Sequence, residues 1–301
     1  MTDTNIDRAV STSGALLADE TRLGGVELKI TDLDRSLDFY TAVLGLSVHE
    51  RGEGFAALGA GGEDLVTLRA DAHAGPAGRH AGLYHYALLF PTREELARAG
   101  ARVAATRTRI DGASDHGTHE AIYLPDPDGI GIELAADRPR EVWPDVNGSA
   151  FFSSGPHPLD VGALFATIDG EGPTALAGGG LRMGHVHLHV GDLDAATRFY
   201  RDGLGFEVRA AMPSAAFVSV GGYHHHIAYN LWRGGGVGPV PDGVVGLEHW
   251  TLVAADQAEL EAVHTRLEML GVALEEREGG PSREAAGTLA RDPSGIAVLI
   301  R

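Results

Sequence analysis

The sequence predicts an α+β fold built from four βαβββ modules, and two internal repeats carry this prediction. Residues 24–48 (GGVELKITDLDRSLDFYTAVLGLSV) match residues 184–208 (GHVHLHVGDLDAATRFYRDGLGFEV), with DLD, FY and LG at a constant offset of 160. Residues 82–96 (GLYHYALLFPTREEL) match residues 246–260 (GLEHWTLVAADQAEL) in the same manner. Repeats at a fixed spacing indicate the duplication of one structural unit.

Each module begins with an alternating strand, continues with an amphipathic helix and ends with short strands separated by Gly, Pro and Asp turns. In the third module the strand at 185–190 (HVHLHV) ends at Gly191, and the helix after it places Phe199, Tyr200 and Leu204 on one face. The order of elements is therefore βαβββ. The first to fourth modules lie at about 22–70, 82–137, 182–233 and 245–301.

The modules suggest a division of the chain into domains. Residues 1–20 are polar and rich in small residues, which predicts a tail. Residues 138–181 are rich in Gly and Pro and lack sustained periodicity, which predicts an interdomain connection. We therefore expect an N-terminal domain at 21–137, with the first two modules, and a C-terminal domain at 182–301, with the last two.

The composition excludes several classes of function. Against 24 basic residues there are 42 acidic ones, and the net charge of −18 disfavours nucleic acid and membrane surfaces as partners. Because the chain has no cysteine, disulfides and thiolate sites are excluded, and His, Asp and Glu are the candidate metal ligands. No apolar run approaches the length of a membrane span and the first 20 residues lack a signal pattern, so we expect a cytoplasmic protein.

Two motifs carry a family resemblance. DLDxxxxFY follows the first strand of the first module, and DPDGxxIE lies on the last strand of the second. With four βαβββ modules, the chain after residue 20 resembles the vicinal oxygen chelate superfamily, and most closely its two-domain catechol 2,3-dioxygenases. This resemblance implies two half-barrel domains, each made of paired modules, with metal ligands on the first and last strands. The superfamily includes glyoxalases, extradiol dioxygenases, fosfomycin-resistance proteins and metal-free bleomycin-binding proteins, so the fold leaves the function open.

The positions that hold ligands in this superfamily can be read in each module. The first strands offer Gly25, His85, His185 and His249, and the last strands of the second and fourth modules offer Glu133 and Leu299. Pairing the modules in chain order leaves both halves incomplete. Pairing the second module with the third gives His85, Glu133 and His185, a triad of two histidines and one carboxylate that suits Fe(II) and also accepts Mn(II).

This pairing departs from known two-domain extradiol enzymes, which usually place the whole site in the C-terminal half. The second and third modules could meet within one chain or across a dimer. The first and fourth modules would then form a metal-free half, in which we expect His249 to be a hydrogen-bonded core or rim residue.

Residues 116–134 (HGTHEAIYLPDPDGIGIEL) closely resemble the extradiol ring-cleaving dioxygenase signature. The one departure is Ser114, two residues before His116, where the signature prefers other residues. The resemblance implies that Glu133 is a metal ligand and that Tyr123 donates a hydrogen bond to the bound substrate or oxygen. His116 would be a further donor around the metal. Independently, the DPDG turn predicts that Tyr123 and Glu133 lie on adjacent antiparallel strands and face one cavity.

A cluster of three histidines lies in YHHHIAYN (223–230), which we expect to be the last strand of the third module. Extradiol enzymes carry an acid–base histidine here, and the resemblance implies that it is His225. Strand alternation would place His224 and His226 on the opposite face, close to the site, so a shift of one residue would exchange the assignment.

The strand HVHLHV places His185, His187 and His189 on one face with a period of two. We expect His187 to line the pocket near the metal. His189 should be exposed near the end of the strand.

These observations predict a non-haem Fe(II) extradiol dioxygenase that opens a catechol-type aromatic diol with O2. Three protein ligands leave about three open metal positions, two for the diol and one for O2. His225 would take and return a proton, while Tyr123 and His116 orient the bound oxygens.

Two alternatives remain open. A glyoxalase-like metal-dependent isomerase or lyase normally needs a second glutamate, where this chain has Ala228 or Asn230. A ligand-binding protein of the bleomycin-resistance type would need no metal. The sequence does not name the catechol, and a homodimer is the candidate assembly because it is the commonest closed one.

Overall fold

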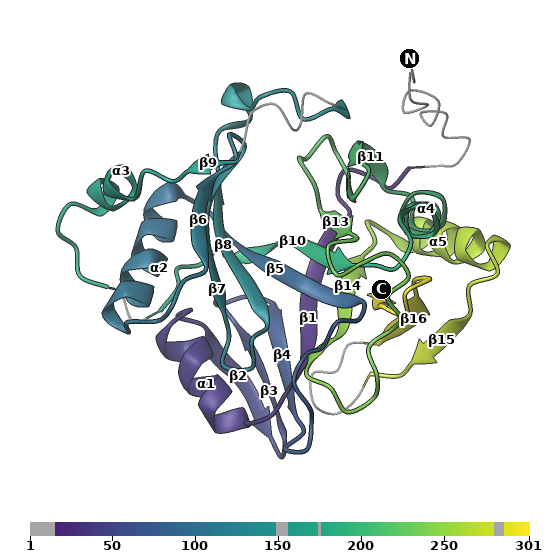
Figure 1. Cartoon of the computed structure of the whole chain (residues 1–301), viewed down its shortest axis with the longest axis horizontal. Helices are drawn as coiled ribbons and strands as arrows, with labels where there is room; N and C mark the ends of the chain where they lie inside the picture. The colour runs from purple at the N-terminus through teal and green to yellow at the C-terminus, as the bar shows by residue number, and fades with distance from the viewer. Residues whose placement is uncertain (1–15, 149–155, 174–175, 280–285) are drawn as a thin grey trace.

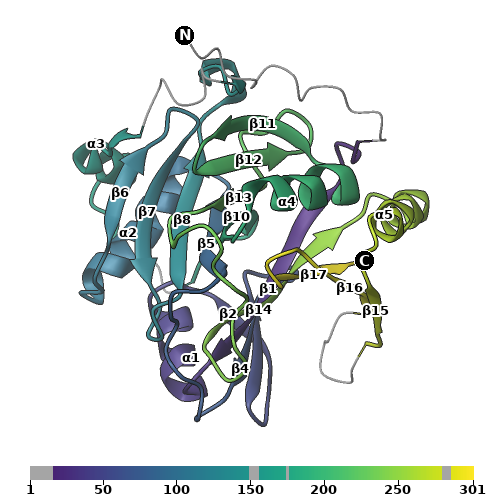
Figure 2. The same ribbon diagram turned by 45° about the vertical axis from the view of Figure 1, so that its right-hand side comes forward.

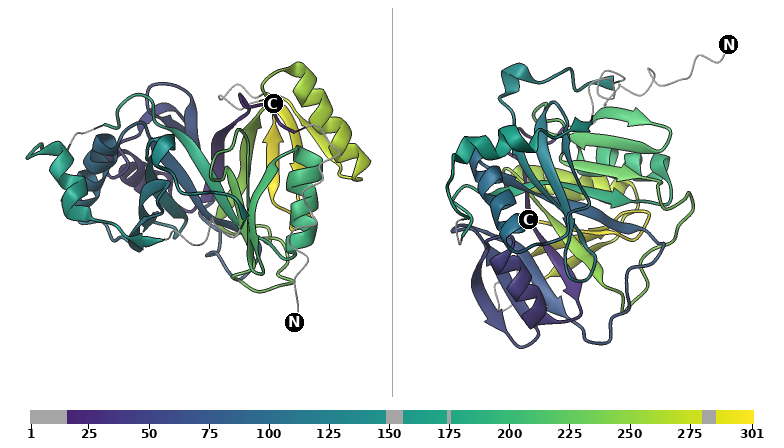
Figure 3. Two further views of the ribbon diagram at one scale, coloured as in Figure 1. Left: turned by 90° about the horizontal axis from the view of Figure 1, so that it is seen from above. Right: turned by 60° about the vertical axis from the view of Figure 1, so that its left-hand side comes forward.

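The computed structural model describes residues 16–148, 156–173, 176–279 and 286–301. Its strands form two sheets, and the helices lie outside them (Figure 1 and Figure 3). This is the α+β architecture of repeated modules that the sequence predicts. Within the described residues, no helix is both long enough and apolar enough to cross a membrane.

The first sheet combines the first and fourth modules, and the second sheet combines the second and third. The first has the strand order β15 (Leu274–Arg277), β16 (Gly287–Arg291), β17 (Ala297–Ile300), β14 (Gly246–Val253), β1 (Arg22–Ile30), β4 (Asp64–Ala70), β3 (Phe55–Gly59) and β2 (Ser47–Gly52). The second has the order β11 (Glu207–Met212), β12 (Ala215–Ser219), β13 (Ile227–Asn230), β10 (Arg182–His189), β5 (Gly82–Phe90), β8 (Gly131–Asp137), β7 (His119–Pro125), β6 (Gly112–Asp115) and β9 (His157–Pro158).

The helices follow the first strands of the modules or lie in the connection between modules. They are α1 (Leu33–Ala42), α2 (Arg93–Ala105), α3 (Val161–Phe165), α4 (Leu193–Thr197) and α5 (Gln257–Met269). Shorter or irregular turns of helix are η1 (Arg140–Val142), η3 (Ala166–Ile168) and the π-helical η4 (Arg198–Leu204), which continues α4.

The centre of each sheet is an antiparallel pair of first strands. β1 pairs with β14, where Val26 is opposite Trp250, and β5 pairs with β10, where His85 is opposite His187. Within each module the first strand also pairs in parallel with the last one. The predicted pairing of the second module with the third is confirmed, and it occurs within one chain (Figure 2).

The two sheets do not follow the expected domains in chain order. Each sheet takes one module from residues 21–137 and one from residues 182–301. A module alone would leave one edge of its first strand unpaired, and a module from the other half of the chain covers that edge. The expected connection at 138–181 also has structure of its own, because β9 extends the second sheet and α3 packs against α2.

The repeated DLD motif starts the helices of the first and third modules. The side chain of Asp32 accepts a hydrogen bond from the backbone N–H of Arg35, and Asp192 accepts one from the N–H of Ala195. These bonds satisfy donors that have no partner within the helix. The motif is thus an N-cap that fixes where each helix begins.

The repeated FY motif ties each of these helices to the next module. The buried Tyr40 hydroxyl donates to Asp126 over 3.1 Å, and Tyr200 makes the matching bond to Asp292 over 3.0 Å. Both aspartates lie in the turn before the last strand of a module, and each also accepts backbone N–H bonds there. Modules that are consecutive in sequence are therefore joined by side chains, although their strands belong to different sheets.

Candidate active site

One face of the second sheet brings the three predicted metal ligands together. On β5, Tyr86 and Leu88 are buried in the core, so alternation sends His85 to the opposite face. Glu133 comes from β8 and His185 from β10, the strands on either side of β5.

A glycine allows the close approach of β8 to β5. A Cβ atom on Gly131 would overlap the carbonyl oxygen of Tyr84, so β8 can lie this close to β5 only with glycine at that position. Gly131 is opposite His85 in the parallel ladder, two residues before Glu133.

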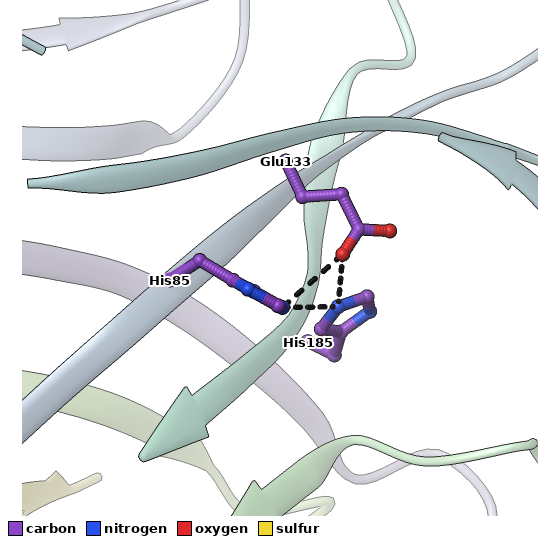
Figure 4. A group of neighbouring side chains, drawn as sticks. All are labelled: His85, Glu133 and His185. Atoms are coloured by element: carbon purple, nitrogen blue, oxygen red, sulfur yellow. Dashed lines mark hydrogen bonds and ion pairs between the residues drawn. The ribbon is translucent and has the colours of Figure 1, made fainter. Parts of the chain in front are cut away.

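The three side chains point to one another in Figure 4. The Nε2 atoms of His85 and His185 are 3.3 Å apart, and they lie 3.1 and 3.0 Å from Oε2 of Glu133. All three residues are buried. Among the described residues, this is the one group of three or more His, Asp or Glu whose ligand atoms all lie within 4.8 Å of one another.

Glu133 carries the negative charge of this group. Its burial acts to raise the pKa, but His185, His119 and His85 outweigh burial and hold the pKa of the Glu133 carboxyl well below its usual range. An ionised carboxylate between two imidazole nitrogens is a donor set for a divalent cation.

His119 belongs to the site although the sequence analysis did not single it out. Its Nε2 lies 3.1 Å from Oε1 of Glu133, and its Nδ1 lies 2.8 Å from the hydroxyl of Thr118. The ring stacks between His116 and His224, with centroids 4.5 Å from each. The sequence could have indicated His119 by strand alternation, because His119 lies four residues before Tyr123 on β7 and residues four apart on a strand share a face.

The two hydrogen-bond donors predicted from the dioxygenase signature, Tyr123 and His116, contact each other beside Glu133. Tyr123 lies opposite Glu133 on the antiparallel pair of β7 and β8, and its hydroxyl is 2.8 Å from Nε2 of His116. Burial and the Glu133 charge raise the pKa of Tyr123. Burial also lowers the pKa of His116 to about 4, so at neutral pH a protonated phenol faces a neutral imidazole.

The histidines at 224–226 differ from the prediction of a continuous strand. β13 begins only at Ile227, so strand alternation does not apply to the three rings. His224 and His225 both line the same pocket, with their Nδ1 atoms 2.9 Å apart, and the ring of His225 lies 4.3 Å from that of His185. The expectation that His224 would lie on the opposite face is therefore wrong.

His226 lies away from the candidate ligands. Its Nδ1 accepts a hydrogen bond from the backbone N–H of Val220 over 3.1 Å. Its side chain lines a different cavity, of about 580 Å³, together with Arg140 and Arg182. The structure therefore does not bring His226 into the pocket near the metal.

His187 lines the pocket as expected, whereas His189 is buried and not exposed. Both rings contact Asn230 on the neighbouring strand β13: Nε2 of His187 is 2.9 Å from Nδ2 of Asn230, and Nδ1 of His189 is 2.7 Å from Oδ1. The parallel pairing of His189 with Asn230 explains the burial, because it continues the sheet over the end of β10.

The three candidate ligands line one pocket of about 380 Å³. They share it with His116, Thr118, His119, Tyr123, His187, His224 and His225. Three kinds of side chain line it: histidines around Glu133, the Tyr123 hydroxyl, and an apolar wall. The apolar and aromatic lining comprises Tyr84, Pro144, Val146, Pro156, Met212, Phe217 and Trp232.

The corresponding place in the first sheet holds different side chains. Glu27 is opposite His249 in the central pair of strands. Arg69 lies 3.2 Å from the Glu27 carboxylate, and Arg277 lies 3.2 Å from Nδ1 of His249. His249 is thus a buried, hydrogen-bonded residue, as expected, beside two arginines that already carry positive charge.

Comparisons with known proteins agree with this architecture. The family model described as "Glyoxalase/Bleomycin resistance protein/Dioxygenase superfamily" matches residues 22–134 and 182–300. A Bacillus subtilis (strain 168) protein named catechol-2,3-dioxygenase is 40% identical over 266 residues, which cover 86% of this chain and 92% of that protein.

Solved structures show the same fold at lower sequence identity. A putative dioxygenase from Bacillus subtilis has a TM-score of 0.63 at 14% identity and covers 96% of this chain and 86% of its own. Glyoxalase I from Zea mays has a TM-score of 0.58 at 18% identity and covers 93% of this chain and 92% of its own. The chain belongs to the glyoxalase, bleomycin resistance protein and dioxygenase superfamily.

Proposed function

We propose that this protein is an extradiol ring-cleaving dioxygenase that opens a catechol-type diol with O2 at a non-haem Fe(II) held by His85, Glu133 and His185. The observation that carries the proposal is the buried triad at the base of a pocket that also contains Tyr123 and His225. The name of the 40% identical relative supports the same class of oxidoreductase.

The donor atoms of the triad fit a metal ion. Ligand atoms at about 2.1 Å from a metal are roughly 3.0 Å apart when they occupy adjacent octahedral positions. The three separations here are 3.0, 3.1 and 3.3 Å. Two imidazoles and one carboxylate on one face of an octahedron are typical of non-haem Fe(II) oxygenases, and Mn(II) accepts the same donors.

Bound Fe(II) would supply open positions for both diol oxygens and for O2 and would lower the pKa of the diol hydroxyls. In the overall reaction the ring C–C bond next to the two hydroxyls breaks, and both atoms of O2 enter the product. Catechol itself would give a yellow hydroxymuconic semialdehyde.

His225 is the proposed acid–base residue. Burial and the neighbouring histidines, foremost His185 and His224, lower its pKa well below the ordinary value, so the ring is in its neutral, base form. It would take a proton from a diol hydroxyl and return it as the ring opens. Tyr123, held by His116, would donate a hydrogen bond to a bound oxygen.

The test begins with anaerobic purification, loading with Fe(II) and addition of catechol in air. Yellow product that requires Fe(II) is expected, with Mn(II), Zn(II) and a metal-free sample measured in parallel. Glu133→Gln should lose both the metal and ring cleavage. Glu261→Gln, the same change at an exposed position of α5, should keep both. Retained iron and ring cleavage in Glu133→Gln would disprove the ligand assignment. Tight iron binding without ring cleavage by the natural chain would disprove the dioxygenase function.

A further inference from the structure

The outer part of the pocket is built from large apolar side chains. Tyr84 and Trp232 form an edge-to-face pair with ring centroids 5.3 Å apart, and Met212 and Phe217 line the same pocket. Tyr84 is 42% and Trp232 51% exposed. Large aromatic side chains gathered and exposed at a pocket are typical of surfaces that contact an apolar ligand.

The same pocket holds no cationic side chain. Among its described lining residues there is no lysine or arginine, and the carboxylates are Glu133 and Asp145. The nearby Arg138 is already paired with Asp115 over 2.7 Å and with Glu120 over 3.2 Å. Residues 149–155, which lie outside the described part of the chain, include no lysine or arginine in their sequence.

Asp145 adds a fixed negative charge to the pocket lining. Its Oδ1 accepts hydrogen bonds from the backbone N–H and the side-chain amide of Asn147, both over 2.9 Å. These bonds, together with the positive charge of Arg209, lower the pKa of the Asp145 carboxyl. Arg209 does not line the pocket and is paired with Glu207 over 2.8 Å. The net charge of −18 for the whole chain acts in the same direction on an approaching anion.

The size of the pocket exceeds what a single ring requires. Its volume of about 380 Å³ lies within the range for sites that enclose drug-sized ligands. A diol bound at His85, Glu133 and His185 would therefore leave room for a substituent that extends along Phe217 toward Tyr84 and Trp232.

We propose that the preferred substrate is a catechol with an uncharged, apolar substituent, and that the pocket discriminates against catechols that carry a carboxylate. This inference rests on the proposed ring-cleaving function and names the substrate class of that site. An apolar substituent gains contact with the aromatic wall. A carboxylate would lose water without finding a cation among the described lining residues, and it would share the pocket with Asp145.

The test compares matched substrates of the iron-loaded protein. 4-Ethylcatechol and 3,4-dihydroxyphenylacetate differ mainly in a terminal methyl or carboxylate, and the methyl ester of the latter removes the charge at similar size. We expect kcat/KM for 4-ethylcatechol and for the ester to exceed that for the acid by at least about tenfold. The 3-substituted pair, 3-methylcatechol and 2,3-dihydroxybenzoate, tests the other ring position, and unsubstituted catechol is the reference.

A charge introduced at the rim should reverse the preference. Met212 lines the pocket at the end of β11, so Met212→Arg should raise kcat/KM for 3,4-dihydroxyphenylacetate relative to 4-ethylcatechol by about tenfold. Met269→Arg makes the same change on α5 at a side chain that is 82% exposed and outside the pocket, and it should leave the ratio unchanged.

The outcomes separate this inference from the proposed function. Suppose that catechol is cleaved, but the carboxylated diols are turned over as well as the apolar ones or better. This result would overturn the proposed substrate class and leave the ring-cleaving function standing, and so would a lower kcat/KM for every substituted diol than for catechol. If no diol is cleaved although iron is bound, the ring-cleaving function fails. In that case the dissociation constants of the apolar and carboxylated diols, measured anaerobically by calorimetry, still test which substituent the pocket prefers. Equal dissociation constants would overturn the proposed preference for apolar substituents.

Discussion

Nε2 of His119 lies 3.1 Å from Oε1 of Glu133, the carboxylate oxygen that does not face His85 and His185. Because an ionised carboxylate only accepts hydrogen bonds, the imidazole must donate through Nε2. Nδ1 of His119 then accepts from the hydroxyl of Thr118, 2.8 Å away. This chain of bonds fixes the orientation of the proposed carboxylate ligand and leaves Oε2 for the metal.

Replacement of His119 with Ala should weaken Fe(II) binding. Loss of a partner that orients a ligating carboxylate typically costs about 10–100-fold in metal affinity. The dissociation constant, measured anaerobically by competition with a chelator, should rise by that factor. His73→Ala removes an exposed histidine and is the matched control, which should bind metal normally. An unchanged metal affinity in His119→Ala would contradict the positioning role.

Replacement of Tyr123 with Phe removes the hydroxyl that lies 2.8 Å from His116 and leaves the ring in place. If this hydroxyl donates to a bound oxygen only as the reaction proceeds, kcat should fall by about 10²-fold with little change in KM. His116→Asn should act through the same hydroxyl, so the double variant should be no slower than Tyr123→Phe alone. Additive losses would show that the two side chains act separately.

The assignment of His225 over His224 can be tested because both rings line the pocket. His225→Gln should lower kcat by about 10²- to 10⁴-fold if it transfers the proton. His224→Gln, the same change at the adjacent position, should lower kcat less, because the ring of His224 lies 6.0 Å from that of His185 and the ring of His225 only 4.3 Å. Steady-state rates over a pH series give the comparison, and the reverse ranking would move the acid–base role to His224.

The bond between Tyr40 and Asp126 should contribute to stability and not to the reaction. Tyr40→Phe leaves a buried carboxylate oxygen without its hydroxyl donor, which should lower the free energy of unfolding by about 1–3 kcal/mol. Tyr84→Phe changes a half-exposed side chain and is expected to be neutral in stability. Chemical denaturation measures both variants, and an unchanged midpoint for Tyr40→Phe would refute the proposed contribution.

His249 should make the folded chain sensitive to acid, independently of the candidate metal site. Burial, then Arg277, lowers its pKa from 6.5 to about 4, whereas an unfolded chain keeps the ordinary value. Between these two pKa values the unfolded state is protonated at His249 and the folded state is not. The contribution of neutral His249 to the free energy of unfolding is therefore complete above pH 6.5 and is lost as the pH falls toward 4.

Between pH 7 and pH 5, the unfolding free energy of the natural chain should fall by about 2 kcal/mol more than that of His249→Gln. The comparison of two chains removes the contribution of the other titrating groups, which both share. Parallel pH profiles from chemical denaturation would rule out a lowered pKa at His249.

Local patterns in the sequence determined the modules and most of the residues of the candidate site. Asp32 and Asp192 precede their helices because a short carboxylate caps free N–H groups. The ligand positions of the superfamily that the chain resembles likewise pointed to His85 and Glu133. A helix cap depends on neighbouring residues and a motif on its spacing, so both could be read without knowing what packs against them.

The tertiary structure decided which strands become neighbours. Periodicity orients a side chain but does not specify its partner strand. The complementary gaps in the ligand positions predicted the pairing of the second module with the third. In the structure this pairing is made by β5 and β10 of one chain. The chain-order domains 21–137 and 182–301 do not coincide with the sheets because each first strand pairs with the first strand of a module from the other half of the chain.

The positions of the remaining histidines also depended on contacts distant in sequence. His224 joins the pocket because the chain has not yet entered a regular strand, and His189 is buried because Asn230 lies beside it. His119 gains its role only when β7 lies next to β8 and its ring meets Glu133. The sequence by itself therefore determined the repeated unit and the types of ligand, whereas long-range strand pairing decided which imidazoles surround the carboxylate.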